Sequence, residues 1–333
     1  MKTILQISVC IIAVLLGGEL LSGVTAAAQQ STDADLERAQ KLLDTHSYDE
    51  ARLTVDVYLK THPSDPEAVV IKSDIYSALG EWDRALKALE EGLSADEDNI
   101  DLLLALAVVY REKLMRSGMF GKMSNAKKSK NALEKAFQID PKHVIVRREM
   151  VFYLVHAPGF AGGDKGRGGR IALETVELDE AEGRLQLAVV HRQNEEYEES
   201  VDQFKQVIEL DPEKDFVYFM LGHVYILMSD FLSAEQIFGM YVDKWPEAAL
   251  PHDGLGDCYT EQKRMDDAIA QYELALDKDA WVGDSRFKVA ELYRKRKNYE
   301  KAAYHYRRLL ELNPGYVDIG KAKKQLRKIE KGR

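Results

Sequence analysis

Apolar and small residues return at the same positions every thirty-four residues along this chain. When Ala234 is placed at position 20 of a repeat, position 20 of the next two repeats holds Ala268 and Ala302. Position 24 is aromatic in all three repeats and position 8 is small. The residues are Phe238, Tyr272 and Tyr306 at position 24, and Gly222, Gly256 and Ala290 at position 8. Small residues suit helix contacts and large ones fill a core, so the period predicts stacked helical hairpins.

This pattern resembles the tetratricopeptide repeat, which has Leu-Gly at positions 7 and 8, Tyr at 11, Ala at 20 and 27, an aromatic residue at 24 and Pro at 32. The resemblance implies an all-α protein, an α-solenoid of about eight helical hairpins over residues 29–316 with a C-terminal capping helix over 317–333. The repeats are expected at residues 32–65, 66–99, 100–143, 144–180, 181–214, 215–248, 249–282 and 283–316.

The third repeat is longer than the others by about ten residues, which lie around residues 112–125. We interpret the surplus as two lengthened helices that meet at breaks at Ser117-Gly118 and Gly121. Residues 111–130 contain seven Lys or Arg and one Glu. This charge is typical of a solvated hairpin tip, and the alternative is a surface for an anionic partner.

The fourth repeat carries a glycine-rich turn at residues 156–170, whose Lys165, Arg167 and Arg170 would suit an anion at a helix N-terminus. Neither a preceding strand nor a GxxxxGK[ST] motif accompanies it, so a nucleotide-binding loop is not indicated. A simpler interpretation is that Pro158 ends one helix and Gly168 allows two helices to approach closely. The motif Pro158-Gly-x-x-Gly-Gly after an elongated third repeat also resembles a group of exported bacterial tetratricopeptide proteins.

Residues 1–28 have the pattern of a secretory signal peptide, with Lys2, an apolar run from Ile4 to Leu16 and small residues up to Ala28. We expect cleavage after Ala28 and an exported protein of bacterial origin, periplasmic or secreted, without an integral membrane span in the mature chain. The alternative is that the segment is retained as an anchor.

The balance of 46 basic and 56 acidic residues gives a net charge of −10, but the tail at 317–333 holds seven basic and two acidic residues. Apolar residues recur in that tail at helical spacing. They are Ile319, Ala322, Leu326 and Ile329. The tail is therefore expected to cap the last repeat and to expose a basic face. Acidic repeats oppose a polyanion, so no nucleic-acid partner is expected.

The sequence contains no motif that indicates a catalytic residue, a cofactor site or a metal site. Eight histidines show no ligand spacing such as HExxH, and no GxSxG elbow occurs. Cys258 is the only cysteine beyond the signal segment, which leaves no pair for a disulfide or zinc site there. We expect a buried thiol and a protein that is not an enzyme.

The resemblance implies a concave groove lined by positions 2, 5, 9, 12 and 13 of each first helix. The apolar stripe expected there, as a protein-binding site, consists of Leu185, Val189, Phe216, Phe219, His223, Ile226, Leu227, Leu250 and Phe287. The alternative is that this stripe packs inside a tightly wound superhelix or against the third repeat's hairpin. Asp253 and Asp257 stand where a carboxylate clamp has Lys and Asn, so no such clamp is present.

These features favour a scaffold that binds a protein or peptide partner through its groove. Two alternatives stay open. One is a small-ligand carrier that uses the groove or the glycine-rich loop of the fourth repeat, and the other is a structural subunit of an envelope assembly.

Overall fold

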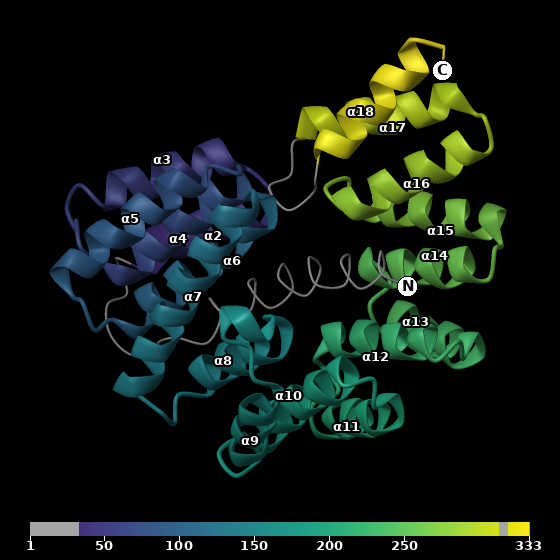
Figure 1. The fold of residues 1–333 in the computed structure, drawn as a ribbon. Coiled ribbons are helices and arrows are strands. Elements are labelled where there is room, and N and C mark those ends of the chain that lie inside the picture. Colours follow the sequence, from purple (N-terminus) through teal and green to yellow (C-terminus); the bar gives the residue numbers. More distant parts are fainter. Residues whose placement is uncertain (1–32, 313–318, 333) are drawn as a thin grey trace. The chain divides into compact units, whose positions relative to one another are not determined.

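The computed structural model describes residues 33–312 and 319–332, and within these residues the chain is helical without any strand (Figure 1). This confirms the all-α class. The signal peptide expected at residues 1–28 lies outside the described residues. Helices follow one another in pairs, and each predicted repeat contains one pair.

The chain forms two compact units, the first ending at Ile171 and the second beginning at Ala172. The helices that begin in the first unit are α2 (Asp33–Asp44), α3 (Tyr48–Tyr58), α4 (Pro66–Ala78), α5 (Trp82–Ala95), α6 (Ile100–Arg116), α7 (Met119–Ile139), α8 (Val144–His156), the short 3-10 helix η2 (Gly159–Ala161) and α9 (Lys165–Val176). Those of the second are α10 (Glu180–Gln193), α11 (Tyr197–Leu210), α12 (Asp215–Leu227), α13 (Phe231–Lys244), α14 (Leu250–Glu261), α15 (Met265–Lys278), α16 (Gly283–Lys295), α17 (Tyr299–Leu312) and α18 (Ile319–Glu330).

The period seen in the sequence places the small and aromatic residues at the helix contacts. Ala234, Ala268 and Ala302 have no exposed surface, as the spacing predicted. Phe238, Tyr272 and Tyr306 at position 24 are also buried. Each of these three hairpins thus joins its two helices through a small residue and fills its interior with one large ring.

The turn between the two helices of a repeat has the same backbone conformation in six of the eight repeats. The residue at position 15 has a positive φ in the pairs joined by a short turn: 59° at His46, 73° at Gly80, 67° at Glu195, 61° at Ser229, 62° at Lys263 and 61° at Lys297. The amide that follows it donates to a carbonyl five residues earlier, as from Arg264 to Tyr259 at 2.9 Å. This is the Schellman ending, in which a left-handed residue lets the last carbonyls of a helix find donors.

The elongated third repeat consists of α6 and α7, which meet at Ser117 and Gly118 as expected. The second break expected at Gly121 is wrong, because this glycine lies in the first turn of α7. Gly118 is the N-cap of that helix, so one interruption is enough to reverse the chain.

The tail forms α18, an amphipathic helix that covers the end of the second unit. Ala322 and Leu326 are buried in the same cluster as Ala302 and Tyr306 of α17, and Ile319 and Ile329 pack against it. The apolar spacing in the tail therefore predicted the packing correctly. A terminal helix of this kind removes from water the apolar face that the last repeat would otherwise expose.

Candidate functional site

The side chains expected to form an open apolar stripe are mostly inside the second unit. Leu185, Val189, Phe216, Phe219, His223 and Ile226 are buried, whereas Leu227, Leu250 and Phe287 are half-buried. The expectation of an open surface is therefore wrong for the first six. Their part in binding a partner stays a prediction.

The reason for this burial is that α12 is enclosed by three neighbours, α11, α13 and α14. The Phe219 ring centroid lies 6.2 Å from that of Phe238 on α13 and 4.4 Å from that of His223 one turn along α12. Phe219 is 2% exposed and fills the interior of its own repeat. Ten of the thirteen residues in α12 are buried, so among its residues in the expected stripe only Leu227 remains partly exposed.

A charged network connects α14 and α16 next to this apolar interior. Lys288 Nζ lies 3.1 Å and 2.9 Å from the two carboxylate oxygens of Asp253 and 2.9 Å from Asp257 Oδ2. Ser285 Oγ donates to Asp253 Oδ1 at 2.6 Å, and Tyr272 OH donates to Asp257 Oδ1 at 2.6 Å. Asp253 and Asp257 are four residues apart, which puts both carboxylates on one face of α14.

The electrostatics of the network follow from its burial. Burial raises the pKa of Asp253, and Lys288 only partly offsets this effect. Burial alone would lower the pKa of the Lys288 ammonium, but Asp253 and Asp257 outweigh it and raise this pKa. Burial raises the pKa of Asp284 to about 7, and its Oδ2 atom has no hydrogen-bond partner within residues 33–312 and 319–332. One lysine thus stands among three aspartates.

His223 on α12 borders the network and lacks the partner that the equivalent residues have. At position 9 of the next two repeats, Asp257 accepts from Tyr272 and Glu291 accepts from Tyr306, both tyrosines being at position 24. In the repeat of His223, position 24 is Phe238, whose ring meets the imidazole edge-on at 5.8 Å between centroids. Both ring nitrogens of His223 are buried and have no hydrogen-bond partner in the part of the chain that the structure describes, and Nε2 lies 3.9 Å from Asp257 Oδ2.

Sequence models of the tetratricopeptide repeat match residues 36–100, 181–214, 219–281 and 284–316, which together are more than half of the chain. The chain belongs to the tetratricopeptide repeat family. Proteins built from these repeats are typically non-enzymatic scaffolds for protein–protein interaction. No curated protein matches the chain in sequence.

Solved structures with the same fold are distant in sequence. A tetratricopeptide repeat protein from Parabacteroides merdae has a TM-score of 0.55 at 16% identity, over 79% of this chain and 99% of its own. A thermophilic protein with these repeats from Thermus thermophilus has a TM-score of 0.51 at 16% identity, over 59% and 100%. The Cut9-Hcn1 hetero-tetramer of APC/C has a TM-score of 0.50 at 17% identity, over 94% and 58%. These likenesses show the fold.

Cys258 of the seventh repeat is buried, as its position in the first helix predicted. Burial raises the pKa of its thiol to about 11, and Gln262 Nε2 donates to the sulfur at 3.3 Å. A thiol that stays protonated is a poor nucleophile. This cysteine is a packing residue of the repeat.

The glycine-rich turn of the fourth repeat is closed by the protein's own groups. A Cβ at Gly163 would lie 1.8 Å from the Ala157 carbonyl oxygen, so only glycine fits there. Asp164 Oδ1 accepts from the Arg167 amide at 2.9 Å, and the Arg167 guanidinium binds both Glu134 oxygens at 2.5 Å and 3.0 Å. Asp164 and Glu134 therefore already accept hydrogen bonds from the helix N-terminus and from Arg167, the donors that an anion would need. A Cβ at Gly168 would lie 2.9 Å from Val155 Cγ1, which confirms the close approach of helices.

The basic hairpin of the third repeat also pairs several of its charges internally. Arg111 forms an ion pair with buried Glu149, Lys113 pairs with Asp83, and Lys128 Nζ lies 5.1 Å from the Tyr110 ring centroid. At the tip, Phe120 is 89% exposed. These pairings favour the interpretation as a protruding, solvated tip.

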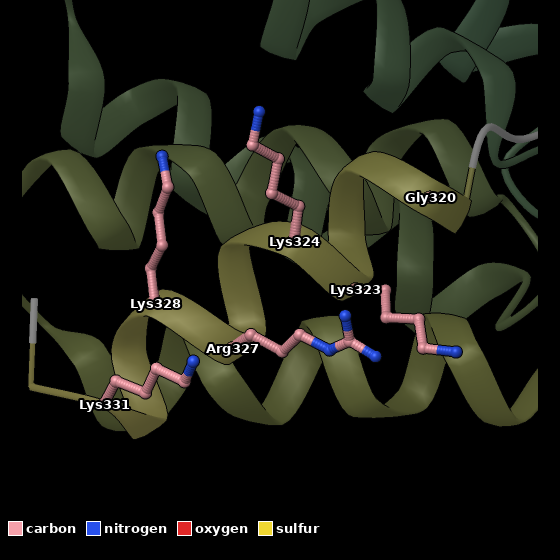
Figure 2. A pocket seen from close by; sticks show the side chains of 6 residues that line it. All are labelled: Gly320, Lys323, Lys324, Arg327, Lys328 and Lys331. Carbon is pink, nitrogen blue, oxygen red and sulfur yellow. The ribbon is translucent and has the colours of Figure 1, made fainter.

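The basic face of α18 is the other concentration of charge in the second unit. Cationic side chains surround a surface hollow of about 280 Å³, lined by Gly320, Lys323, Lys324, Arg327, Lys328 and Lys331. Figure 2 shows that these side chains fan out from one helix and do not converge on a common point. The arrangement fits the solvated side of a capping helix.

Two general features complete the description of residues 33–312 and 319–332. No helix in these ranges is both long and apolar enough to cross a membrane. In the same ranges, no three His, Cys, Asp or Glu side chains gather as metal ligands would.

Proposed function

We propose that this protein is an exported, non-enzymatic scaffold that binds an extended segment or a helix of a partner protein. The binding surface is the face made by the first helices of repeats six to eight, α12, α14 and α16. Membership of the repeat family supports the scaffold role. The signal-like pattern of residues 1–28 supports export.

The observation that carries the proposal is the charged network among these three helices. Stacking of hairpins requires only apolar and small residues at helix contacts, whereas burying charges costs free energy unless they are paired. Asp257 and Lys288 still reach the surface, with side chains 16% and 10% exposed. A polar cluster in a place where the fold does not need one is typical of a recognition site.

Apolar side chains on the same helices complete the surface. Leu227 on α12, Leu250 on α14 and Phe287 on α16 are the three members of the expected stripe that remain partly exposed. Partly exposed apolar side chains beside a small set of polar groups can bury a partner's side chains and fix their orientation at once. We therefore place the partner on these three residues together with Asp257 and Lys288.

Affinity capture from a bacterial envelope extract tests this surface when two matched variants are compared. Leu250→Ser changes the proposed face, and Leu274→Ser changes a 42% exposed leucine on the second helix α15. We expect a stoichiometric partner with the wild-type protein and with Leu274→Ser, and a loss of that partner with Leu250→Ser. Equal capture by both variants would contradict the proposed surface.

Two further measurements separate the remaining possibilities. Native mass spectrometry of the purified protein would favour a small-ligand carrier if it showed a retained metabolite that Leu250→Ser had lost. Mass spectrometry of the N-terminus from an exporting host is expected to show Gln29 as the first residue. An intact Met1 in the membrane fraction would instead show a retained anchor.

A further inference from the structure

The charged network on α14 and α16 has more carboxylates than cations. Lys288 has three N–H donors, and its three short contacts to Asp253 and Asp257 account for all of them. One ammonium can neutralise only one of the two carboxyl groups, so the network has more acidic groups than cations to pair with them. No other lysine or arginine forms an ion pair with these two aspartates in the described part of the chain.

Asp284 adds a third carboxyl group whose hydrogen bonding is incomplete. Its Oδ2 atom is buried and has no hydrogen-bond partner among the described residues. Asp253 and Asp257 lie close enough to disfavour its ionisation, while Lys288 favours it. A buried oxygen without a donor destabilises a folded protein, so a donor from outside would be bound favourably here.

His223 provides a second, independent set of polar atoms without a protein partner beside the network. The residue is 5% exposed, its ring nitrogens lack partners, and Nε2 points towards Asp257 at 3.9 Å. Burial, followed by the charge of Lys288, lowers the pKa of this imidazole to about 3. The ring is therefore neutral at pH 7, and one of its nitrogens can accept a hydrogen bond.

We propose that this face, made by His223, Asp253, Asp257, Asp284 and Lys288, binds a protonated amine or guanidinium carried by the partner segment. The inference rests on the proposed function and names the chemistry of the partner: a lysine or arginine side chain. The cation donates to Asp284 Oδ2 and to the imidazole, which are the acceptors that the protein's own donors leave open. The excess of carboxylates supplies the charge complementarity.

The test uses small cationic probes and does not need the partner. Nα-acetyl-lysine methylamide is titrated into the full chain with ¹⁵N-labelled histidine, and the His223 signals are identified by their loss in His223→Phe. We expect a saturable shift of the His223 signals with the lysine probe and with its arginine analogue. Nα-acetyl-norleucine methylamide, which has the same apolar stem without the charge, should cause none.

Two aspartate variants locate the binding. Asp284→Asn should weaken binding of the lysine probe at least about tenfold, because it removes the charge from the open acceptor. Asp202→Asn, on the exposed face of α11, is the matched control and should leave the affinity unchanged. If Asp284→Asn does not fold, His223→Phe replaces it, with binding followed by saturation transfer to the probe, and a weaker affinity is again expected.

Three results would overturn the inference: no saturable shift up to about 10 mM lysine probe, an equal shift with the norleucine probe, or the same His223 shift with Ca²⁺ alone. Failure of the inference and failure of the proposed function are distinguishable. If wild type and Asp284→Asn capture the partner equally, the result supports the scaffold role and contradicts the cation site. If the lysine probe binds but no partner protein is captured, the result supports the cation site and contradicts the scaffold role.

Discussion

Gly222 on α12 leaves open the space that the ring of Phe238 on α13 occupies. A Cβ built at residue 222 would lie 2.4 Å from Phe238 Cζ. The seventh repeat shows the same relationship, since a Cβ at Gly256 would lie 2.5 Å from Tyr272 Cε1. The small residue at position 8 and the ring at position 24 are therefore one packing unit, which explains why they recur together.

Gly222→Ala should lower the free energy of unfolding by about 1–3 kcal/mol, because the added methyl group overpacks the hairpin. The matched control is Gly239→Ala on α13, where a Cβ would meet nothing within 4 Å. That change should stabilise the protein by up to about 1 kcal/mol through helix propensity. Urea denaturation followed by circular dichroism measures both. Similar values for the two variants would contradict the packing unit.

The sequence predicted the hairpins well because their contacts lie within one period. The burial of positions 20 and 24 could be predicted from the sequence of a single hairpin. The same holds for the burial of Cys258 and for the apolar face of α18. The exposure of Phe219 could not be judged in that way, because it depends on how closely α13 and α14 approach α12. The break at Gly121 was misplaced because Ser117, the C-cap of α6, and Gly118, the N-cap of α7, already separate the two helices. A glycine in a first helical turn is tolerated.

The charged network was only half visible in the sequence. Asp253 and Asp257 stood out as acidic residues at groove positions, but their contacts with Lys288 join residues 35 and 31 positions apart in neighbouring repeats. The sequence signal that could have identified Lys288 is its position in the eighth repeat, one residue after the position that is equivalent to Asp253. The open nitrogens of His223 had a signal in the sequence, because position 24 of that repeat is Phe238 where the next two repeats have Tyr272 and Tyr306. The open oxygen of Asp284 has no such signal.

The left-handed conformation of the turn residue leads to opposite expected changes in stability for substitutions in two repeats. Gly80 has a φ of 73°, so Gly80→Ala should destabilise the protein by about 1 kcal/mol. Lys263 has a φ of 62° with a side chain present, so Lys263→Gly should stabilise it by about 0.5 kcal/mol. Thermal unfolding of the two single variants provides the comparison. Destabilisation by Lys263→Gly of the same size as by Gly80→Ala would show that the turn is not strained.

His223→Phe should make the protein more stable, and more so as the pH falls. The folded-state pKa of His223 is about 3, below the value of about 6.5 in an unfolded chain, so the unfolded state binds the proton first. Stability is thus lost as the pH falls from about 6.5 towards 3, at up to about 1.4 kcal/mol per pH unit. The charged groups that face the imidazole are Asp253 and Asp257 from α14, Lys288 from α16 and Arg192 from α10.

Urea denaturation between pH 4.5 and 7 measures this difference. The unfolding free energy of His223→Phe should exceed that of the wild type by an amount that increases at each lower pH. His62→Gln, which replaces an exposed histidine, is the control and should follow the wild-type curve. A constant difference between His223→Phe and wild type across this range would mean that His223 accepts a proton readily in the folded protein.

Cys258 should react with a maleimide only after denaturant is added. Its thiol is buried, and a pKa of about 11 leaves almost no thiolate at pH 7. Peptide mass mapping counts Cys258 separately from Cys10. A cysteine introduced by Leu274→Cys on the exposed side of α15 should be labelled within the time in which Cys258 stays unmodified. Fast labelling of Cys258 in the native protein would show that this residue does not lie at the helix contact.

Photo-crosslinking in the exporting host tests most directly which face binds the partner. A benzophenone amino acid replaces Phe287, a half-buried aromatic residue on the proposed face of α16, or Leu274 on the second helix α15. Both proteins should fold as the wild type does, as judged by circular dichroism and melting. We expect a specific cross-link to a partner protein from position 287 and none from position 274. A cross-link from position 274 alone would place the partner on the opposite side of the repeats and contradict the proposed binding surface.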